Sequence, residues 1–135
     1  ASLLAFWILA YIFGSVTDVS LSSKIISEGI SLQKAAIVEA ILAALLVFVY
    51  FATMIDRRGP SSFGPIALGF VVLVSQLFAF SISGGFINPA KALPIALAGN
   101  FMTELPIWIV GPLTGSLFGL VYEYVYLKKV ISPSK

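Results

Sequence analysis

The stretch SGGFINPAK at residues 83–91 decides the fold, because it starts a helix in the middle of sequence that is otherwise typical of a membrane protein. Asn88 is a favourable N-cap residue, and Pro89 suits the first helical position, where its missing N–H and fixed φ are no disadvantage. The residues that follow are apolar apart from Lys91 and end at Gly99, a residue type typical of helix ends. The stretch therefore predicts a helix that begins at about Asn88 and ends near Gly99.

A helix of this length cannot cross a lipid bilayer. Roughly ten residues at 1.5 Å each extend about 15 Å, which is half of the ~30 Å hydrocarbon core. Backbone that stops at this depth is tolerated only where it is buried in protein or lines a water-filled cavity. The stretch thus predicts a pore or a binding site near the membrane midplane.

The composition indicates an integral membrane protein. The chain is 59% apolar and only 10% charged, whereas a soluble domain has about 25% charged residues. It has no cysteine and no histidine, so we expect neither a metal site nor a cofactor. The net charge of +2 is small, which argues against nucleic acid as a partner. No nucleophile or phosphate-binding loop is evident, and we do not expect an enzyme.

Apolar runs divide the chain into predicted membrane segments. Residues 1–17 are predicted to be the later part of a first span, and residues 18–34 an outward-facing polar connection. Residues 35–129 contain three further spans, with a pore loop and half-helix at 83–99, and residues 130–135 form a tail. We therefore predict an all-α membrane bundle of four spanning helices, the first one truncated, and one re-entrant half-helix.

Basic residues predict the orientation of this bundle. Arg57 and Arg58 lie on the same predicted face as the lysines near the C-terminus, Lys128, Lys129 and Lys135. Lysine and arginine are enriched in cytoplasmic loops. We therefore expect a cytoplasmic C-terminus.

The triplet Asn88, Pro89 and Ala90, preceded by Ser-Gly-Gly and followed by a basic residue, resembles the second pore loop of the aquaporin (major intrinsic protein) family. The resemblance covers essentially the whole sequence, because further motifs lie at the expected spacings. These are VE at 38–39, FAT at 51–53, DRR at 56–58, PIALG at 65–69 and VGPL at 110–113.

The resemblance implies the later part of a six-helix inverted-repeat fold, in which the site lies where the two repeats meet. Residues 35–129 would form the second repeat, and the missing N-terminal half, with a first NPA motif, would complete the pore. A water channel of the plasma membrane, assembled as a homotetramer, is then expected. Small neutral solutes are further candidate permeants.

The resemblance also implies which residues line the pore. Asn88 would donate from its amide to passing water, while the half-helix dipole opposes protons and cations. Lys91 stands where the family usually has arginine at its narrowest constriction. Gln76 stands where water-selective members have histidine, and Gly85 where some have cysteine.

Each of these residues also has a plainer explanation, and the sequence leaves both open. Asn88 would cap a helix in any protein. Lys91 could extend its ammonium to the membrane interface, although a cation in the first turn opposes the helix dipole. Gln76 could hydrogen-bond to a neighbouring helix.

Glu39 is the one carboxylate well inside a predicted span, and acidic residues at such depth are usually functional. The resemblance implies that it accepts hydrogen bonds from the non-helical backbone at 83–87. A proton relay is the alternative, but no second acid, histidine or cysteine is placed to pass a proton on.

Three glycines, Gly111, Gly115 and Gly119, repeat every four residues in the last predicted span. They share one helix face, and small residues at this spacing let two helices approach closely. We predict a role in helix packing.

Two other classes of membrane protein share part of this pattern. A secondary transporter can also place the N-terminus of a half-helix at the midplane. In a non-conducting structural protein, the NPA triplet would merely cap a buried helix. Transport measurements, rather than the sequence, distinguish these classes from a channel.

Overall fold

The computed structural model describes residues 2–13, 26–99 and 101–127. The predicted C-terminal tail, Lys128, Lys129, residues 18–25 of the predicted polar connection and Asn100 lie outside the described residues. The end of the first predicted span, residues 14–17, lies outside them as well.

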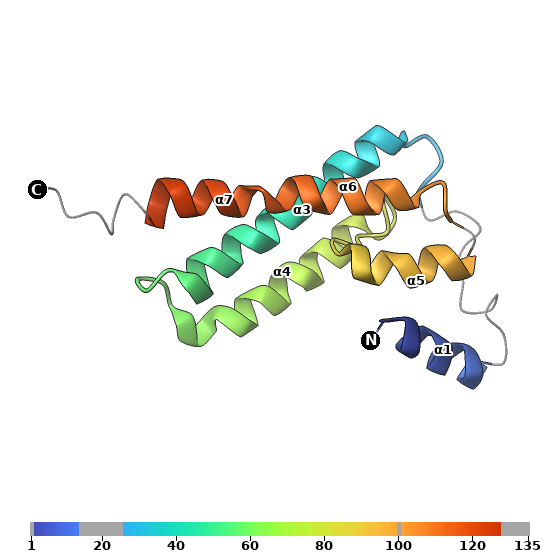
Figure 1. The fold of residues 1–135 in the computed structure, drawn as a ribbon, viewed down its shortest axis with the longest axis horizontal. Helices are drawn as coiled ribbons and strands as arrows, with labels where there is room; N and C mark the ends of the chain where they lie inside the picture. The colour runs from blue at the N-terminus through green and yellow to red at the C-terminus, as the bar shows by residue number, and fades with distance from the viewer. Residues whose placement is uncertain (1, 14–25, 100, 128–135) are drawn as a thin grey trace, which may run out of the picture.

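Helices make up the whole of the regular structure in the described residues, and three rods run along the long axis of the molecule (Figure 1). The first rod is α3 (Leu32–Tyr50) with the π-helical turn η1 (Phe51–Ile55). The second is the 3₁₀ turn η2 (Ser61–Phe63) with α4 (Gly64–Ala79). The third is α6 (Leu105–Ser116) with α7 (Phe118–Tyr122) and the π-helical turn η3 (Glu123–Leu127). Two shorter helices, α1 (Ser2–Phe13) and α5 (Pro89–Gly99), lie at one end.

The three rods, Leu32–Ile55, Ser61–Ala79 and Leu105–Leu127, are long and apolar enough to cross a membrane. The two short helices are not, because α1 has 12 residues and α5 has 11, against the ~20 that spanning needs. The all-α membrane fold predicted from the sequence is therefore confirmed. The first rod begins three residues before the predicted span, because Ser31 caps it by accepting a hydrogen bond from the N–H of Lys34.

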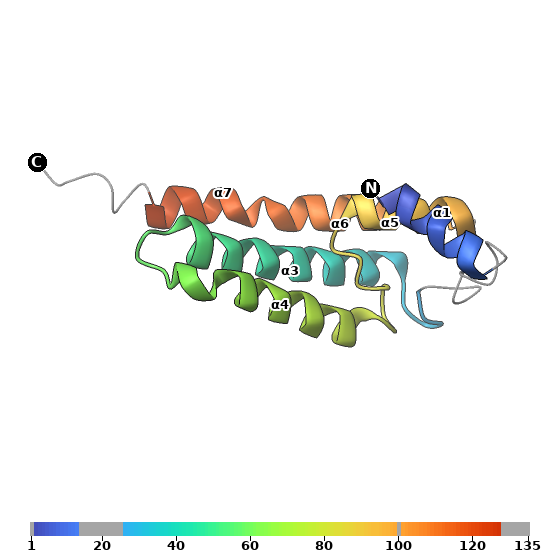
Figure 2. The ribbon, with the colours of Figure 1, turned by 90° about the horizontal axis from the view of Figure 1, so that it is seen from below.

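Helix α3 lies between α4 on one side and the α6–α7 rod on the other (Figure 2). The predicted glycine face of α6 and α7 packs against α3. A Cβ atom added at Gly111 would lie 2.8 Å from the carbonyl oxygen of Ala36, and one at Gly119 would lie 2.7 Å from a methyl carbon of Val47. Real Cβ atoms essentially never come this close, so glycine permits the contact between these helices.

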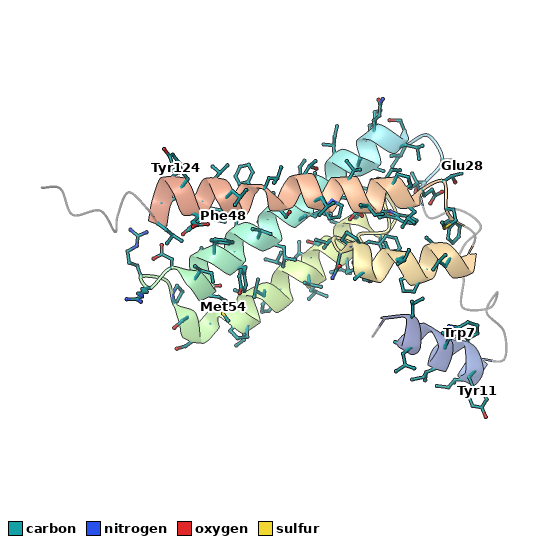
Figure 3. The ribbon with its side chains drawn as sticks, viewed as in Figure 1. Trp7, Tyr11, Glu28, Phe48, Met54 and Tyr124 are labelled. Atoms are coloured by element: carbon teal, nitrogen blue, oxygen red, sulfur yellow. The ribbon has the colours of Figure 1, made fainter. Side chains whose placement is uncertain are left out.

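Apolar side chains remain exposed over much of the surface of this protein. Tyr11 of α1 projects away from the other helices (Figure 3), and 64% and 90% of the surfaces of Trp7 and Tyr11 are exposed. Exposed apolar area of this extent is typical of surfaces that face lipid or another protein.

Candidate functional site

The segment between α4 and α5 leaves the helical conformation in a defined way. Helix α4 ends at Ala79, whose carbonyl oxygen accepts the N–H groups of Ile82, Ser83 and Gly84 at 3.0, 2.9 and 3.0 Å. The φ angles of Gly84 and Gly85 are +89° and +61°, values that glycine adopts without a steric penalty. The backbone therefore leaves the helical conformation after Ala79 and turns away from α4.

Glu39 of α3 binds the rest of this segment and is fully buried. Its Oε1 accepts the hydroxyl of Ser83 at 2.7 Å and the backbone N–H of Phe86 at 3.0 Å, and its Oε2 accepts the N–H of Ile87 at 2.6 Å. The N–H of Gly85 donates to the Ser83 hydroxyl at 3.4 Å. Every backbone N–H from residue 82 to residue 87 thus has an acceptor, as buried backbone requires.

Ile87 has a φ of +59°. This left-handed conformation is a genuine outlier for a β-branched residue and costs about 1–3 kcal/mol. The short hydrogen bond from its N–H to Glu39 opposes relaxation of the backbone at this point. The loop is therefore strained, and Glu39 holds it.

Trp108 of α6 binds the loop from another helix, and the sequence did not single it out. Its side chain is fully buried, and its Nε1–H donates to the carbonyl oxygen of Ser83 at 2.8 Å. Its ring lies 4.5 Å from that of Phe86, between centroids, at an angle of 57°. The sequence offers only a general indication of this role, which is that a buried tryptophan usually needs a hydrogen-bond acceptor for its N–H.

Asn88 caps α5, and the helix begins where the sequence predicts. The Oδ1 of Asn88 accepts the N–H of Ala90 at 2.9 Å, and its backbone carbonyl accepts the N–H of Lys91 at 3.0 Å. Pro89 occupies the first helical position. Because Oδ1 is engaged, the exposed side chain presents its NH₂ group as a donor.

The other predicted constriction residues lie around this loop. The Nε2 of Gln76 donates to the carbonyl oxygen of Gly85, and a Cβ added at Gly85 would lie 3.2 Å from that nitrogen. Lys91 is exposed, and its Nζ lies 5.7 Å from the ring centroid of Phe86. The structure thus joins Gln76 to Gly85 and places Lys91 beside the same loop.

A separate polar cluster lies at the opposite end of the rods. Arg58 donates to both carboxylate oxygens of Asp56, at 2.9 and 2.6 Å, and the hydroxyl of Tyr122 donates to Oδ2 at 3.3 Å. The Arg58 guanidinium holds the pKa of the Asp56 carboxyl well below its usual range. The cluster ties the turn between α3 and α4 to α7.

Across residues 2–13, 26–99 and 101–127, no group of three or more acidic side chains could hold a metal ion.

Known proteins resemble this chain over most of its length. It is 39% identical to the probable aquaporin TIP2-2 of Oryza sativa subsp. japonica over 103 residues, which are 74% of this chain and 42% of the relative. It is 36% identical to aquaporin NIP2-1 of Zea mays over 98 residues, 73% of this chain and 33% of that protein. With aquaporin TIP4-1 of Arabidopsis thaliana it shares 35% identity over 133 residues, 96% of this chain and 52% of the relative.

The chain therefore spans from a third to about half of the length of these relatives. The model of the major intrinsic protein family matches residues 1–122. With three rods long and apolar enough to cross a membrane, this chain is an integral membrane protein, and it belongs to the major intrinsic protein family.

Proposed function

We propose that the protein containing this chain is a passive channel for water, and that small neutral solutes are further permeants. The observation that supports this most strongly is the loop that Glu39 holds. It ends at Asn88, which starts an 11-residue helix too short to span the membrane. Membrane-buried backbone of this kind is expected where it lines a watery path.

The proposed mechanism is electrostatic and involves no covalent step. The N-terminus of α5 presents a partial charge of roughly +0.5, and the NH₂ of Asn88 offers a hydrogen-bond donor beside it. A water molecule would turn its oxygen toward this donor and pass. Hydronium and metal cations would be repelled, more strongly if the ammonium of Lys91 also lines the path.

The pore requires a part that these 135 residues do not supply. The relatives are two to three times as long as the segment they share with this chain, which fits a second repeat with its own half-helix. A complete pore would form where the two repeats meet. We further propose a homotetramer located in the plasma membrane, with the C-terminus of each subunit in the cytoplasm.

Substitution of Lys91 tests the proposal. At an effective dielectric of about 20, a unit charge ~4 Å from a passing cation contributes roughly 4 kcal/mol, which is close to a thousandfold in rate. Lys91→Ala should therefore keep or raise water flux and admit cations. Lys91→Arg should narrow the path and reduce passage of urea or glycerol, because the guanidinium is larger and forms a rigid fork of donors.

The assay compares water, urea and cation permeability of the complete protein in proteoliposomes of matched protein content. Lys34→Ala is a suitable control, because Lys34 is likewise an exposed lysine in the first turn of a helix, on α3, but lies outside the segment 83–91. If all three permeabilities are unchanged in both Lys91 variants, Lys91 does not line the constriction. Flux that depends on a Na⁺ or H⁺ gradient would identify a transporter instead, and absence of osmotic swelling would identify a non-conducting protein.

A further inference from the structure

Phe86 connects Lys91 to the buried part of the protein. The Nζ of Lys91 lies 5.7 Å from the Phe86 ring centroid, within the ~6 Å at which an ammonium is attracted to an aromatic face. The same ring packs against Trp108 at 4.5 Å. The proposed channel mechanism makes no use of Phe86.

The position of the Phe86 ring is fixed from several sides. Its backbone N–H donates to Glu39 at 3.0 Å, and only 7% of the residue is exposed. Trp108, which packs on the ring, is fully buried and is itself held by the hydrogen bond to Ser83. Lys91, in contrast, is exposed at the end of a flexible four-carbon stem. The contact therefore restricts the lysine rather than the phenylalanine.

We propose that Phe86 is a positioning residue that holds the ammonium of Lys91 at the mouth of the half-helix and thereby sets how strongly the channel excludes cations. The negative face of the ring attracts the charge. Lysine lacks the fork of donors by which an arginine would be held, so the ring restrains its charge instead. The inference rests on the proposed function, in which Lys91 faces the permeating species.

Fluorinated phenylalanines at position 86 test this with little change of shape. Each added fluorine weakens the negative potential of the ring face, so the ammonium is held less firmly. Cation–π contacts shift an equilibrium by roughly 2- to 30-fold. The ratio of cation to water permeability should therefore rise stepwise with fluorine content, by up to that factor, in proteoliposomes of the complete protein.

Phe101 provides the matched control. It has the same exposed fraction, 7%, and belongs to the same buried cluster as Phe86 and Trp108. Among the described residues, the ring with a cation over it is that of Phe86. The same fluorinated series at position 101 should leave the permeability ratio unchanged, and an equal rise there would overturn the proposal by showing an effect of packing.

The Lys91→Ala background separates this inference from the proposed function. If Lys91→Ala raises the permeability ratio and fluorination of Phe86 then adds nothing, Phe86 acts through Lys91, as proposed. Two results would overturn the role of Phe86 and leave the channel proposal intact. One is a further rise of the permeability ratio on fluorination in the Lys91→Ala background. The other is an unchanged ratio across the fluorinated series in the wild type while Lys91→Ala admits cations. If Lys91→Ala itself does not change the ratio, the placement of Lys91 in the constriction fails as well.

Discussion

Replacement of Glu39 by glutamine, which exchanges a single heavy atom, should weaken the loop. The carboxylate accepts one hydroxyl and two backbone N–H groups on its two oxygens. An amide keeps only one acceptor oxygen. Whichever way it turns, at least one backbone N–H of Phe86 or Ile87 faces an NH₂ group and loses its partner.

The magnitude follows from these contacts. A buried donor without an acceptor costs about 1–3 kcal/mol, and a hydrogen bond to a charged group contributes about 1.5–3 kcal/mol. Because the two effects overlap at whichever N–H loses its acceptor, we expect a total loss of about 2–4 kcal/mol. For a protein of this size that corresponds to a fall of roughly 10 °C in melting temperature.

Thermal unfolding in detergent measures the loss, and hydrogen exchange of a peptide covering residues 82–88 locates it. Glu123→Gln is the matched control, because Glu123 is an exposed carboxylate at the other end of the third rod. Yield, melting temperature and exchange should change for Glu39→Gln and not for Glu123→Gln, and the loss of yield should exceed any change in the selectivity of the protein that does assemble. Wild-type melting temperature and wild-type protection of the loop in Glu39→Gln would refute the reasoning.

Three further predictions concern other parts of the molecule. Gly115→Ala should lower yield and melting temperature, because an added Cβ would clash with the Ala40 carbonyl oxygen. Gly69→Ala is the control and should be neutral or stabilising, because a Cβ there meets nothing within 4 Å. Equal effects of the two substitutions would count against the packing argument. Mercurial reagents should not block water flux, because the sequence has no cysteine, and reversible inhibition would point to a thiol outside these 135 residues. Asp56→Asn should lower the melting temperature at neutral pH. Because Arg58 lowers the folded-state pKa of Asp56, the higher stability of the wild type should persist down to about pH 4 and shrink only below that pH. A loss of this stability difference already between pH 7 and 5 would contradict the assignment.

The sequence predicts those features of the site that depend on residues close together in the chain. The start of α5 depends on Asn88 and Pro89, whose preferences act within one helical turn. The link between Glu39 and the loop joins residues 44 to 48 positions apart, and no local rule predicts it. It could be anticipated only because the family resemblance supplies the tertiary arrangement.

The aromatic part of the site could not be predicted in the same way. Phe86 and Trp108 differ little, in sequence, from any other large apolar residue of a membrane helix or loop. Their roles depend on tertiary contacts: α6 brings the indole N–H of Trp108 to the Ser83 carbonyl, and the loop places the Phe86 ring beside Lys91. Likewise, the resemblance places Gln76 at the constriction, but its hydrogen bond to Gly85 depends on how α4 ends.

The energetics at Ile87 explain why an acid on α3 matters more to this loop than the helix cap beside it. The left-handed backbone at Ile87 costs about 1–3 kcal/mol, and the hydrogen bond from its N–H to the buried carboxylate contributes about 1.5–3 kcal/mol, so the two nearly offset each other. The cap at Asn88 stabilises the first turn of α5 by ~1 kcal/mol but does nothing for the residue before it. Without the carboxylate, the backbone at Ile87 would relax first and would take Asn88 with it. The position of Asn88 therefore depends on Glu39, through the strain at Ile87, while the cap hydrogen bond of Asn88 directs its amide.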